Sequence, residues 1–358
     1  MVSTSTLLLA MVVVVLAAAV AWYLHRLRST KKPLEEAAND YAAGLNYLVG
    51  GDRALALQKF REVVRRDTNN IDAYVKIGDI FRDAGHHERA AKVHRDLLAR
   101  TNLTSHQHVQ ILRSLAKDYD AAGKHELALG SVQKIREINR NDLWALELEM
   151  QLYERLEQWS KAFEACEALG KVRGERQNAR LALYLNNEGL QLAEQSSEKS
   201  SRVKFREALK IDPQSPEAYI NLADSYIREG RSEDALETLR KFIEKNPARA
   251  SLAFARIKDV LFSIGEFGEI ENIYSSIIEE FPENKDAQIA LAEIYEKKGE
   301  INRAIQLCLE VLDKDSHYGP ARRMLVVCYH KKGDNGRAVE HALKYMSEQS
   351  AAGVHTVS

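Results

Sequence analysis

Three histidines lie close together in the stretch IGDIFRDAGHHERAAKVHRDLL, which runs from Ile77 to Leu98. They are His86, His87 and His94, and imidazole rings can bind a metal ion or transfer a proton. A metal site requires ligands that converge on one point. The helical pattern places His86 and His87 in a turn and His94 on the helix that follows, so the three rings point in different directions. We therefore predict no metal site here, and a packing or solvated role for each histidine.

The other residue types that could do chemistry are also not arranged for it. Cys166, Cys308 and Cys328 have no metal-type spacing, and their odd number argues against a disulfide framework. Cysteines used in this way suit a reducing compartment, and we expect Cys166 and Cys308 to be buried. No GxSxG, HExxH, P-loop or GxGxxG pattern is present. The sequence thus predicts neither an enzyme nor a cofactor-binding protein.

The composition narrows the fold and the class of partner. The 51 Lys and Arg nearly cancel the 52 Asp and Glu, which leaves a formal net charge of −1. A chain with so little net charge has no overall field that would attract nucleic acid. There are only six prolines among 358 residues, with many Ala, Leu, Glu, Lys and Arg. This composition predicts an all-helical protein that does not bind nucleic acid.

An internal repeat explains the histidine-rich stretch. Gly78 is followed three residues later by Phe81, seven later by Gly85, twelve later by Ala90 and sixteen later by His94. The same spacing recurs in steps of 34 to 39 residues. The residues equivalent to Gly78, which we call the anchors, are Gly44, Gly78, Ala116, Met150, Gly189, Ala223, Lys258, Ala292 and Val326.

Each position of the repeat has a physical reason. The anchor and the residue twelve later are small because two antiparallel helices approach closely there. The glycine permits a tight turn, and Pro213, Pro247 and Pro282 end second helices. This helix-turn-helix pattern resembles the tetratricopeptide repeat (TPR) family. It implies an all-α fold, with a right-handed α-solenoid of about nine TPR hairpins. Repeat five (Gly189, Ser196, Ser201) and repeat seven (Lys258, Ile270) are the weakest matches.

The N-terminus has the pattern of a transmembrane helix. Leu7 to Leu24 is apolar for 18 residues, which is just long enough to cross a bilayer. A membrane-flanking set follows the pattern of an aromatic belt and a cytoplasmic basic segment; it comprises Trp22, Tyr23, Arg26, Arg28, Lys31 and Lys32. A cleaved signal peptide is the alternative, with small residues at 17–21, but its positive charges should precede the apolar run.

These patterns predict four segments and a topology. We expect an anchor with its basic flank at 1–28, a short linker at 29–36, the TPR solenoid at 37–352 and a tail at 353–358. The basic residues after the apolar run place the N-terminus outside and the repeats in the cytoplasm, so we expect a single-pass protein of the bacterial inner membrane.

The first helix of each TPR lines a concave groove, which predicts where protein partners bind. Counting from the anchors gives the groove residues Asp79, Arg82, Arg113, Lys117, Trp144, Glu147, Gln151, Asn187, Asn221, Asp224, Arg256 and Asp259. The alternative is an ordinary solvated helix face. Chaperone-binding TPR domains grip a terminal carboxylate with five basic or amide residues. Only Asn221 and Arg256 match that set, while Asn186, Leu190 and Leu252 do not, so we predict no carboxylate clamp.

A narrower resemblance comes from the order of the parts. An N-terminal anchor and a short basic linker precede DYAAGLNYLVGGDRALALQKF (Asp40 to Phe60), the histidine stretch, and LTSHQHVQILRSLAKDYDAAGKHELAL (Leu103 to Leu129). Together these resemble the lipopolysaccharide assembly protein B family of Gram-negative inner membranes. The resemblance implies a non-enzymatic adaptor that holds the deacetylase of lipid A synthesis near a membrane-bound AAA+ protease. Family members usually end in a rubredoxin-like domain with two CxxC pairs, which this sequence does not contain.

Two other functions stay open. One is a general scaffold for a membrane or secretion complex, and the other is a periplasmic envelope assembly factor. We also expect a partner or a second copy of the chain to cover the helix from Gly336 to Gln349, because the last repeat has no obvious polar cap.

Overall fold

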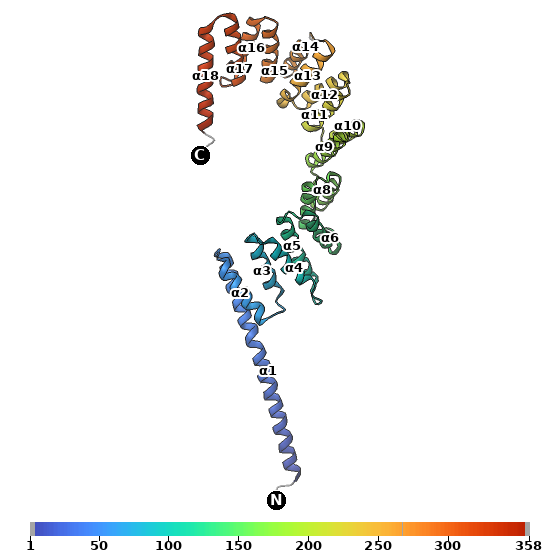
Figure 1. Ribbon diagram of the computed structural model, residues 1–358, viewed down its shortest axis with the longest axis vertical. Coiled ribbons are helices and arrows are strands. Elements are labelled where there is room, and N and C mark those ends of the chain that lie inside the picture. The colour runs from blue at the N-terminus through green and yellow to red at the C-terminus, as the bar shows by residue number, and fades with distance from the viewer. Residues whose placement is uncertain (1–3, 267, 355–358) are drawn as a thin grey trace. The chain divides into compact units, whose positions relative to one another are not determined.

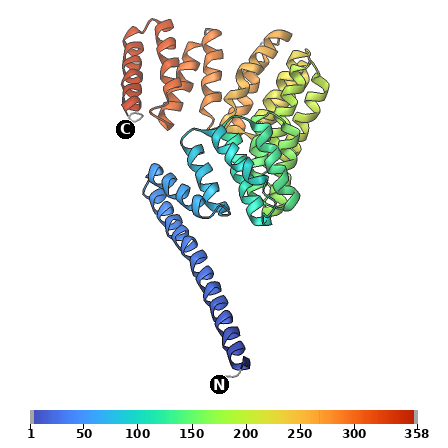
Figure 2. The ribbon, with the colours of Figure 1, turned by 60° about the horizontal axis from the view of Figure 1, so that its bottom comes forward.

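Helices form all the regular secondary structure in the part of the chain that the computed structural model describes, which is residues 4–266 and 268–354. The side chains of 4–15, 24–34 and 349–354 lie outside the described set. The helices divide into two compact units, Met1–Glu175 and Arg176–Ser358. In each unit consecutive helices lie side by side as antiparallel hairpins (Figures 1 and 2). The predicted all-α hairpin array is therefore confirmed.

The first unit holds four hairpins, made by α1 (Thr4–Val49), α2 (Arg53–Arg66), α3 (Ile71–Asp83), α4 (His87–Leu98), α5 (Ser105–Ala121), α6 (His125–Ile138), α7 (Leu143–Arg155) and α8 (Trp159–Arg173). The second unit holds α9 (Asn178–Glu194), α10 (Glu198–Ile211), α11 (Pro216–Arg228), α12 (Ser232–Lys245), the 3₁₀ turn Pro247–Arg249, α13 (Ser251–Ile264), α14 (Glu269–Glu280), α15 (Lys285–Lys297), α16 (Ile301–Lys314), α17 (Gly319–Lys332) and α18 (Asn335–Val354).

One contact recurs where the two helices of a hairpin cross. The large side chain sixteen residues after the anchor lies directly on the anchor. A β-carbon added at Gly78 would lie 2.4 Å from Nε2 of His94, and one at Gly189 would lie 2.6 Å from the ring of Phe205. A β-carbon at such a distance requires the facing ring or a helix to shift. The glycine thus sets how closely the helices approach.

The small residues twelve positions after the anchors are buried at the same crossings. Their exposed fractions are 0% at Ala56, Ala90, Ala128, Ala162, Ser201, Ala235 and Ala304, and 7% at Ala338. This burial confirms the register read from the sequence. It includes repeat five, where Ser201 replaces the usual alanine.

The turn inside each hairpin uses a left-handed residue seven positions after the anchor. Glycine occupies this position in most hairpins, with φ between 70° and 83° at Gly51, Gly85, Gly123, Gly230, Gly265, Gly299 and Gly333. Repeats four and five place Glu157 (φ 53°) and Ser196 (φ 59°) there instead. A side chain with a β-carbon is strained in this region, so these two turns are less favourable.

The N-terminal helix is longer than predicted from the sequence. α1 is continuous from Thr4 to Val49, so the segment 29–36 that we expect to be a linker is helical. Leu16, Val20, Trp22 and Tyr23 on this helix are 56–62% exposed. Among the residues that the structure describes, no helix has both the length and the apolar character needed to cross a membrane. Much of the predicted anchor, and the basic flank Arg26, Arg28, Lys31 and Lys32, has side chains outside the described residues.

Replacing Ser196 by glycine should stabilise the second unit by about 0.5–1 kcal/mol, because glycine adopts positive φ without strain. Urea unfolding of the full chain in detergent, followed by circular dichroism, measures the change. Ser196→Ala is the matched control, since alanine keeps the β-carbon and should bring no gain. Equal stabilisation by alanine would show that backbone strain is not the cause.

Candidate protein-binding grooves

The first unit brings together a basic and aromatic cluster on α5 and α7. The guanidinium carbon of Arg113 lies 5.3 Å from the centre of the Trp144 indole, and Nζ of Lys117 lies 5.8 Å from the same centre. A cation at this distance over an aromatic face is attracted by the electron density of the ring. We call these three residues the Trp144 cluster. The sequence placed all three in the groove, and the structure brings them into contact.

Arg113 is held in place by an ion pair. Its Nη2 donates to Oδ2 of Asp142 at 2.6 Å, while Oδ1 of Asp142 accepts from the backbone N–H of Ala145 and caps α7. The Arg113 side chain is 41% exposed, and Lys117 is also exposed. The cluster therefore offers positive charge next to a large apolar ring. Such a surface suits a protein segment that carries carboxylates beside apolar side chains.

Asp79 and Arg82, which the sequence also placed in the groove, are committed to contacts between repeats. Nη1 of Arg82 lies 2.8 Å from Oδ1 of Asp79 and 3.1 Å from Oδ1 of Asp118, on α5. Burial lowers the pKa of the Arg82 guanidinium, but Asp79 and Asp118 outweigh this effect and raise it. The Arg82 side chain is only 17% exposed, so this pair contributes less to a binding surface than the Trp144 cluster.

His94 belongs to the same buried network. Its ring is fully buried, with Nδ1 2.5 Å from Oδ2 of Asp118 and Nε2 3.2 Å from the backbone carbonyl oxygen of Val75. The two ring nitrogens therefore connect His94 to α5 on one side and to α3 on the other. The predicted packing role of His94 is confirmed, and its polar partner was missed. The sequence signal for this polar partner was Asp118 itself, because most other repeats have an apolar residue at the equivalent position.

Two further predicted residues lie on α7. Glu147 forms an ion pair with Arg173 on α8, and Gln151 is exposed. Because Glu147 is paired with Arg173, its carboxylate does not act as an independent binding group beside Trp144. Gln151 is exposed and therefore accessible to a protein partner.

In the second unit, two of the predicted groove residues, Asp224 and Arg256, pair with each other, and a third, Asn221, pairs with Asn186. The Nδ2 of Asn221 donates to Oδ1 of Asn186 at 2.9 Å, between α11 and α9. Arg256 on α13 donates twice to the carboxylate of Asp224, at 2.6 Å and 2.9 Å. The pKa of Arg256 is raised, chiefly by its hydrogen bonds to Asp224. Such pairing fixes the helices relative to one another. Asn187 is half-buried and Asp259 is exposed.

Sequence reasoning missed a cleft of about 250 Å³ farther along the second unit. It is lined by the first helices α13, α15 and α17 and by Tyr274 of α14, and its charged lining residues are Lys258, Asp286, Glu293 and Lys297. The sequence signal for this cleft was Lys258, which places a long cationic side chain at an anchor position. The other repeats have a small or apolar residue there. Tyr318 also lines the cleft and donates a hydrogen bond to Asp286. Burial, followed by this hydrogen bond, raises the pKa of Tyr318.

The described residues do not form a metal centre. No group of three or more His, Cys, Asp or Glu side chains among them is arranged to hold a metal ion. Cys166 and Cys308 are buried as predicted, with exposed fractions of 2% and 0%, and Cys328 is also buried. Burial raises the pKa of the Cys328 thiol to about 11, which keeps it protonated at neutral pH.

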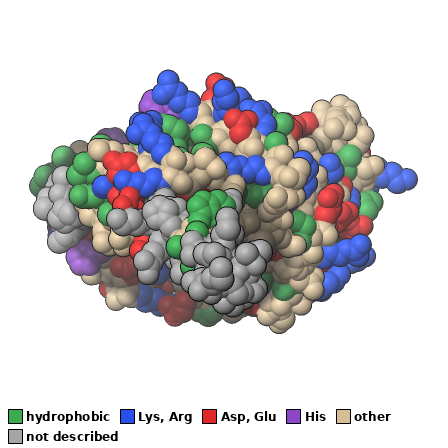
Figure 3. Space-filling view, turned by 90° about the horizontal axis from the view of Figure 1, so that it is seen from below, with side chains coloured by type: hydrophobic (Ala, Val, Ile, Leu, Met, Phe, Trp, Pro, Cys, Tyr) green, Lys and Arg blue, Asp and Glu red, His purple; other side chains and the backbone are tan. Residues whose placement is uncertain are grey.

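On the face seen in Figure 3, basic and acidic side chains of the described residues are interspersed.

The chain has recognisable relatives. Models of the tetratricopeptide repeat family match residues 41–104, 199–256 and 261–315. Lipopolysaccharide assembly protein B of Escherichia coli (strain K12) is 25% identical over 286 residues, which cover 79% of this chain and 73% of that protein. The protein of the same name from Haemophilus influenzae is 25% identical over 297 residues, covering 79% and 74%.

Solved structures with similar repeats include a tetratricopeptide repeat protein from Parabacteroides merdae. It covers 82% of this chain and 99% of its own, at 15% identity and a TM-score of 0.34. The crystal structure of MamA covers 46% and 96%, at 21% identity and a TM-score of 0.34.

Replacing Asp118 by asparagine should lower the free energy of unfolding by about 3 kcal/mol, because His94 and Arg82 would lose their shared buried carboxylate. Asp120→Asn on the same helix is the matched control. Its carboxylate is 20% exposed, against 0% for Asp118, and pairs with His125 and with Arg155, which is 45% exposed, so the loss should stay below about 1 kcal/mol. Urea unfolding of both variants decides between a buried charge network and an incidental contact. Equal, small losses would contradict the network.

Proposed function

We propose that this tetratricopeptide repeat protein, a relative of lipopolysaccharide assembly protein B, is a non-catalytic adaptor that acts in the control of lipopolysaccharide synthesis. The observation that carries the proposal is the sequence relationship over 79% of the chain. A match of that extent includes parts of both helical units. The hairpin array supports the adaptor role, because stacked repeats expose long surfaces to protein partners.

The client that we propose is the deacetylase of lipid A synthesis, which the adaptor would present to a membrane-bound AAA+ protease. The contact surface would include the Trp144 cluster in the first unit. Arg113 and Lys117 provide positive charge, and the indole provides apolar area that loses water on binding. Aromatic and arginine side chains dominate the energetics of many protein interfaces.

We also propose that the N-terminal segment anchors the chain in the bacterial inner membrane, with the repeats in the cytoplasm. The apolar run from Leu7 to Leu24 and the basic residues that follow it support this topology. In the described part of the run, Leu16, Val20 and Trp22 are 60%, 56% and 62% exposed. Cytoplasmic and periplasmic reporter proteins fused after Ser358 test it. A reporter active only in the periplasm would reverse the orientation.

Depletion of the protein should raise the cellular level of the deacetylase and, with it, the amount of lipid A. Immunoblotting and lipid A quantification during depletion measure both. Levels that do not change would exclude the regulatory role and leave a general scaffold for a membrane or secretion complex.

Replacing both Arg113 and Lys117 by alanine should weaken client binding about tenfold, because the Trp144 cluster loses its positive charge. Lys241 and Lys245 on α12 form the matched control pair, since both are exposed and each pairs with a nearby glutamate. Affinity is measured with the purified full-length chain, and thermal unfolding monitors its fold. If the control pair weakened binding equally, the loss would reflect net charge and not this cluster.

A further inference from the structure

A groove of about 420 Å³ lies between α4 and α6, the second helices of two neighbouring repeats in the first unit. It is separate from the Trp144 cluster, because none of the three residues of that cluster lines it. The charged residues that line the groove are Arg89, Lys92, Arg95, Lys124 and Glu88. Four of these five are cations, so the groove is positively charged.

Three of the four cations carry a charge that the described residues do not neutralise. Lys124 is paired, since its Nζ donates to Oε1 of Glu88 at 2.8 Å across the groove. Arg89, Lys92 and Arg95 are exposed, and none of them forms an ion pair with a described residue. The positive charge of α4 is therefore open to a partner that brings carboxylates.

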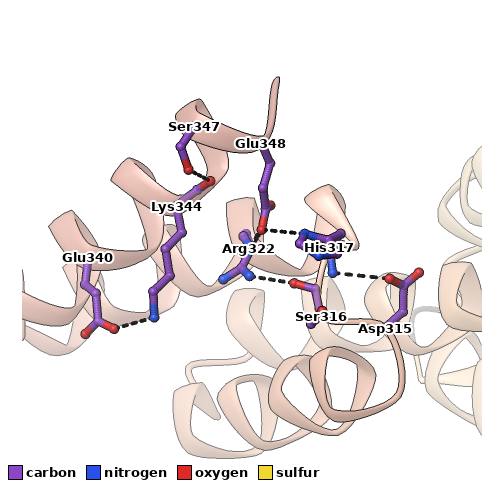
Figure 4. Close-up of polar contacts among 8 residues, drawn as sticks. All are labelled: Asp315, Ser316, His317, Arg322, Glu340, Lys344, Ser347 and Glu348. Carbon is purple, nitrogen blue, oxygen red and sulfur yellow. Dashed lines mark hydrogen bonds and ion pairs between the residues drawn. The ribbon is translucent and has the colours of Figure 1, made fainter. Parts of the chain in front are cut away.

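Carboxylates neutralise many of the cations elsewhere on the protein. On α18, for example, Nζ of Lys344 donates to Oε1 of Glu340 at 2.7 Å (Figure 4). The groove has no such arrangement on its α4 side. Asp96 and Glu126 belong to α4 and α6, but neither is among the residues that line the groove.

The spacing of the unpaired cations fits a helical partner. Arg89, Lys92 and Arg95 follow one another in steps of three residues, which is about 4.5 Å along the helix axis for each step. Carboxylates that recur every three or four residues on a second helix have nearly the same rise. Side chains on one face of an extended segment are about 6.6 Å apart, so they match the row less well.

The groove also offers apolar contact beside its charges. Leu127 on α6 lines it and is 52% exposed, and Tyr119 on α5 lines it as well. A helix with carboxylates on one side and apolar side chains beside them would cover both parts of the groove. A bilayer surface is flat and fits a groove between two helices less closely. These features favour a protein helix over a membrane.

We propose that the groove between α4 and α6 binds an acidic amphipathic helix of a partner protein. Carboxylates of that helix would pair with Arg89, Lys92 and Arg95, and its apolar side chains would cover Leu127. The chain would then have two separate binding surfaces, this groove and the Trp144 cluster. The inference goes beyond the proposed adaptor role and does not depend on it, because it uses only the charges and spacing of residues in the first unit.

A synthetic helical peptide, in which glutamates recur every three or four residues beside a row of leucines, serves as the probe. Its affinity for the purified full-length chain in detergent is measured by fluorescence anisotropy. Replacing Arg89, Lys92 and Arg95 together by alanine should weaken binding about tenfold or more, because three charge pairs are lost. A peptide of the same composition in scrambled order, without the acidic face, should bind as weakly as the triple variant binds the probe.

The matched control removes the same number of charges from the second unit. Lys241, Lys245 and Lys344 are exposed, and each pairs with a nearby glutamate. Their joint replacement by alanine should leave the affinity for the probe within about twofold. An equal loss in both triple variants, or equal binding of the probe and the scrambled peptide, would overturn the proposal. Thermal unfolding of each variant shows that the fold is retained.

Cysteine crosslinking locates the bound helix. The probe with one leucine replaced by cysteine should form a disulfide with Leu127→Cys on mild oxidation. Leu55→Cys on α2 is the matched control, because Leu55 is 41% exposed and also lies eleven residues after its anchor. The native cysteines are buried, and the unsubstituted chain gives the background. A product that forms no faster with Leu127→Cys than with Leu55→Cys would contradict binding in this groove.

Short-chain phosphatidylglycerol, added to the same samples, tests a lipid headgroup as the ligand. We expect the peptide to stay bound in its presence, and its affinity to keep its dependence on Arg89, Lys92 and Arg95. Lipid binding that depends on these three residues, together with peptide binding that does not, would overturn the proposal.

Discussion

The close crossing of two helices inside each hairpin is the contact on which the rest of the structure depends. Phe60, His94 and Phe205 lie on glycine anchors, where even a β-carbon would collide with the ring. This contact fixes the distance and rotation of the two helices. It therefore decides which side chains of the first helix face outward. A groove built on such hairpins is only as well ordered as these crossings, because each repeat packs on its neighbours alone.

That rigidity gives the groove charges two different roles. Arg82 with Asp118, and Arg256 with Asp224, use their charges to join neighbouring repeats, and they leave little net field at the surface. In the Trp144 cluster, Arg113 also pairs with Asp142 of the next repeat, but Lys117 is exposed beside the aromatic face. The cleft at Lys258 presents charge of both signs. Partner binding is thus expected to concentrate at a few places along the array. The remaining charged residues maintain the stacking that forms those places.

The sequence predicted the hairpins because their spacing is local. The anchors, the buried residues such as Ala90 and the turn residues such as Gly85 repeat every 34 to 39 positions, and each follows from helix packing or from positive φ. The polar pairs could not be predicted in the same way. Asp118 meets His94 across 24 residues, and Asp224 meets Arg256 across 32, so both depend on the rotation of helices in different repeats. The continuous α1 was missed because the segment 29–36 contains Pro33, which usually interrupts a helix, whereas the structure continues the helix through it.

Crosslinking of the protein in native membranes, followed by affinity purification and mass spectrometry, tests the adaptor role most directly. We predict that the lipid A deacetylase and a membrane-bound AAA+ protease are recovered together, above the level obtained with an unrelated membrane protein that carries the same tag. Recovery of other assembly factors without either enzyme would contradict a role in controlling lipopolysaccharide synthesis.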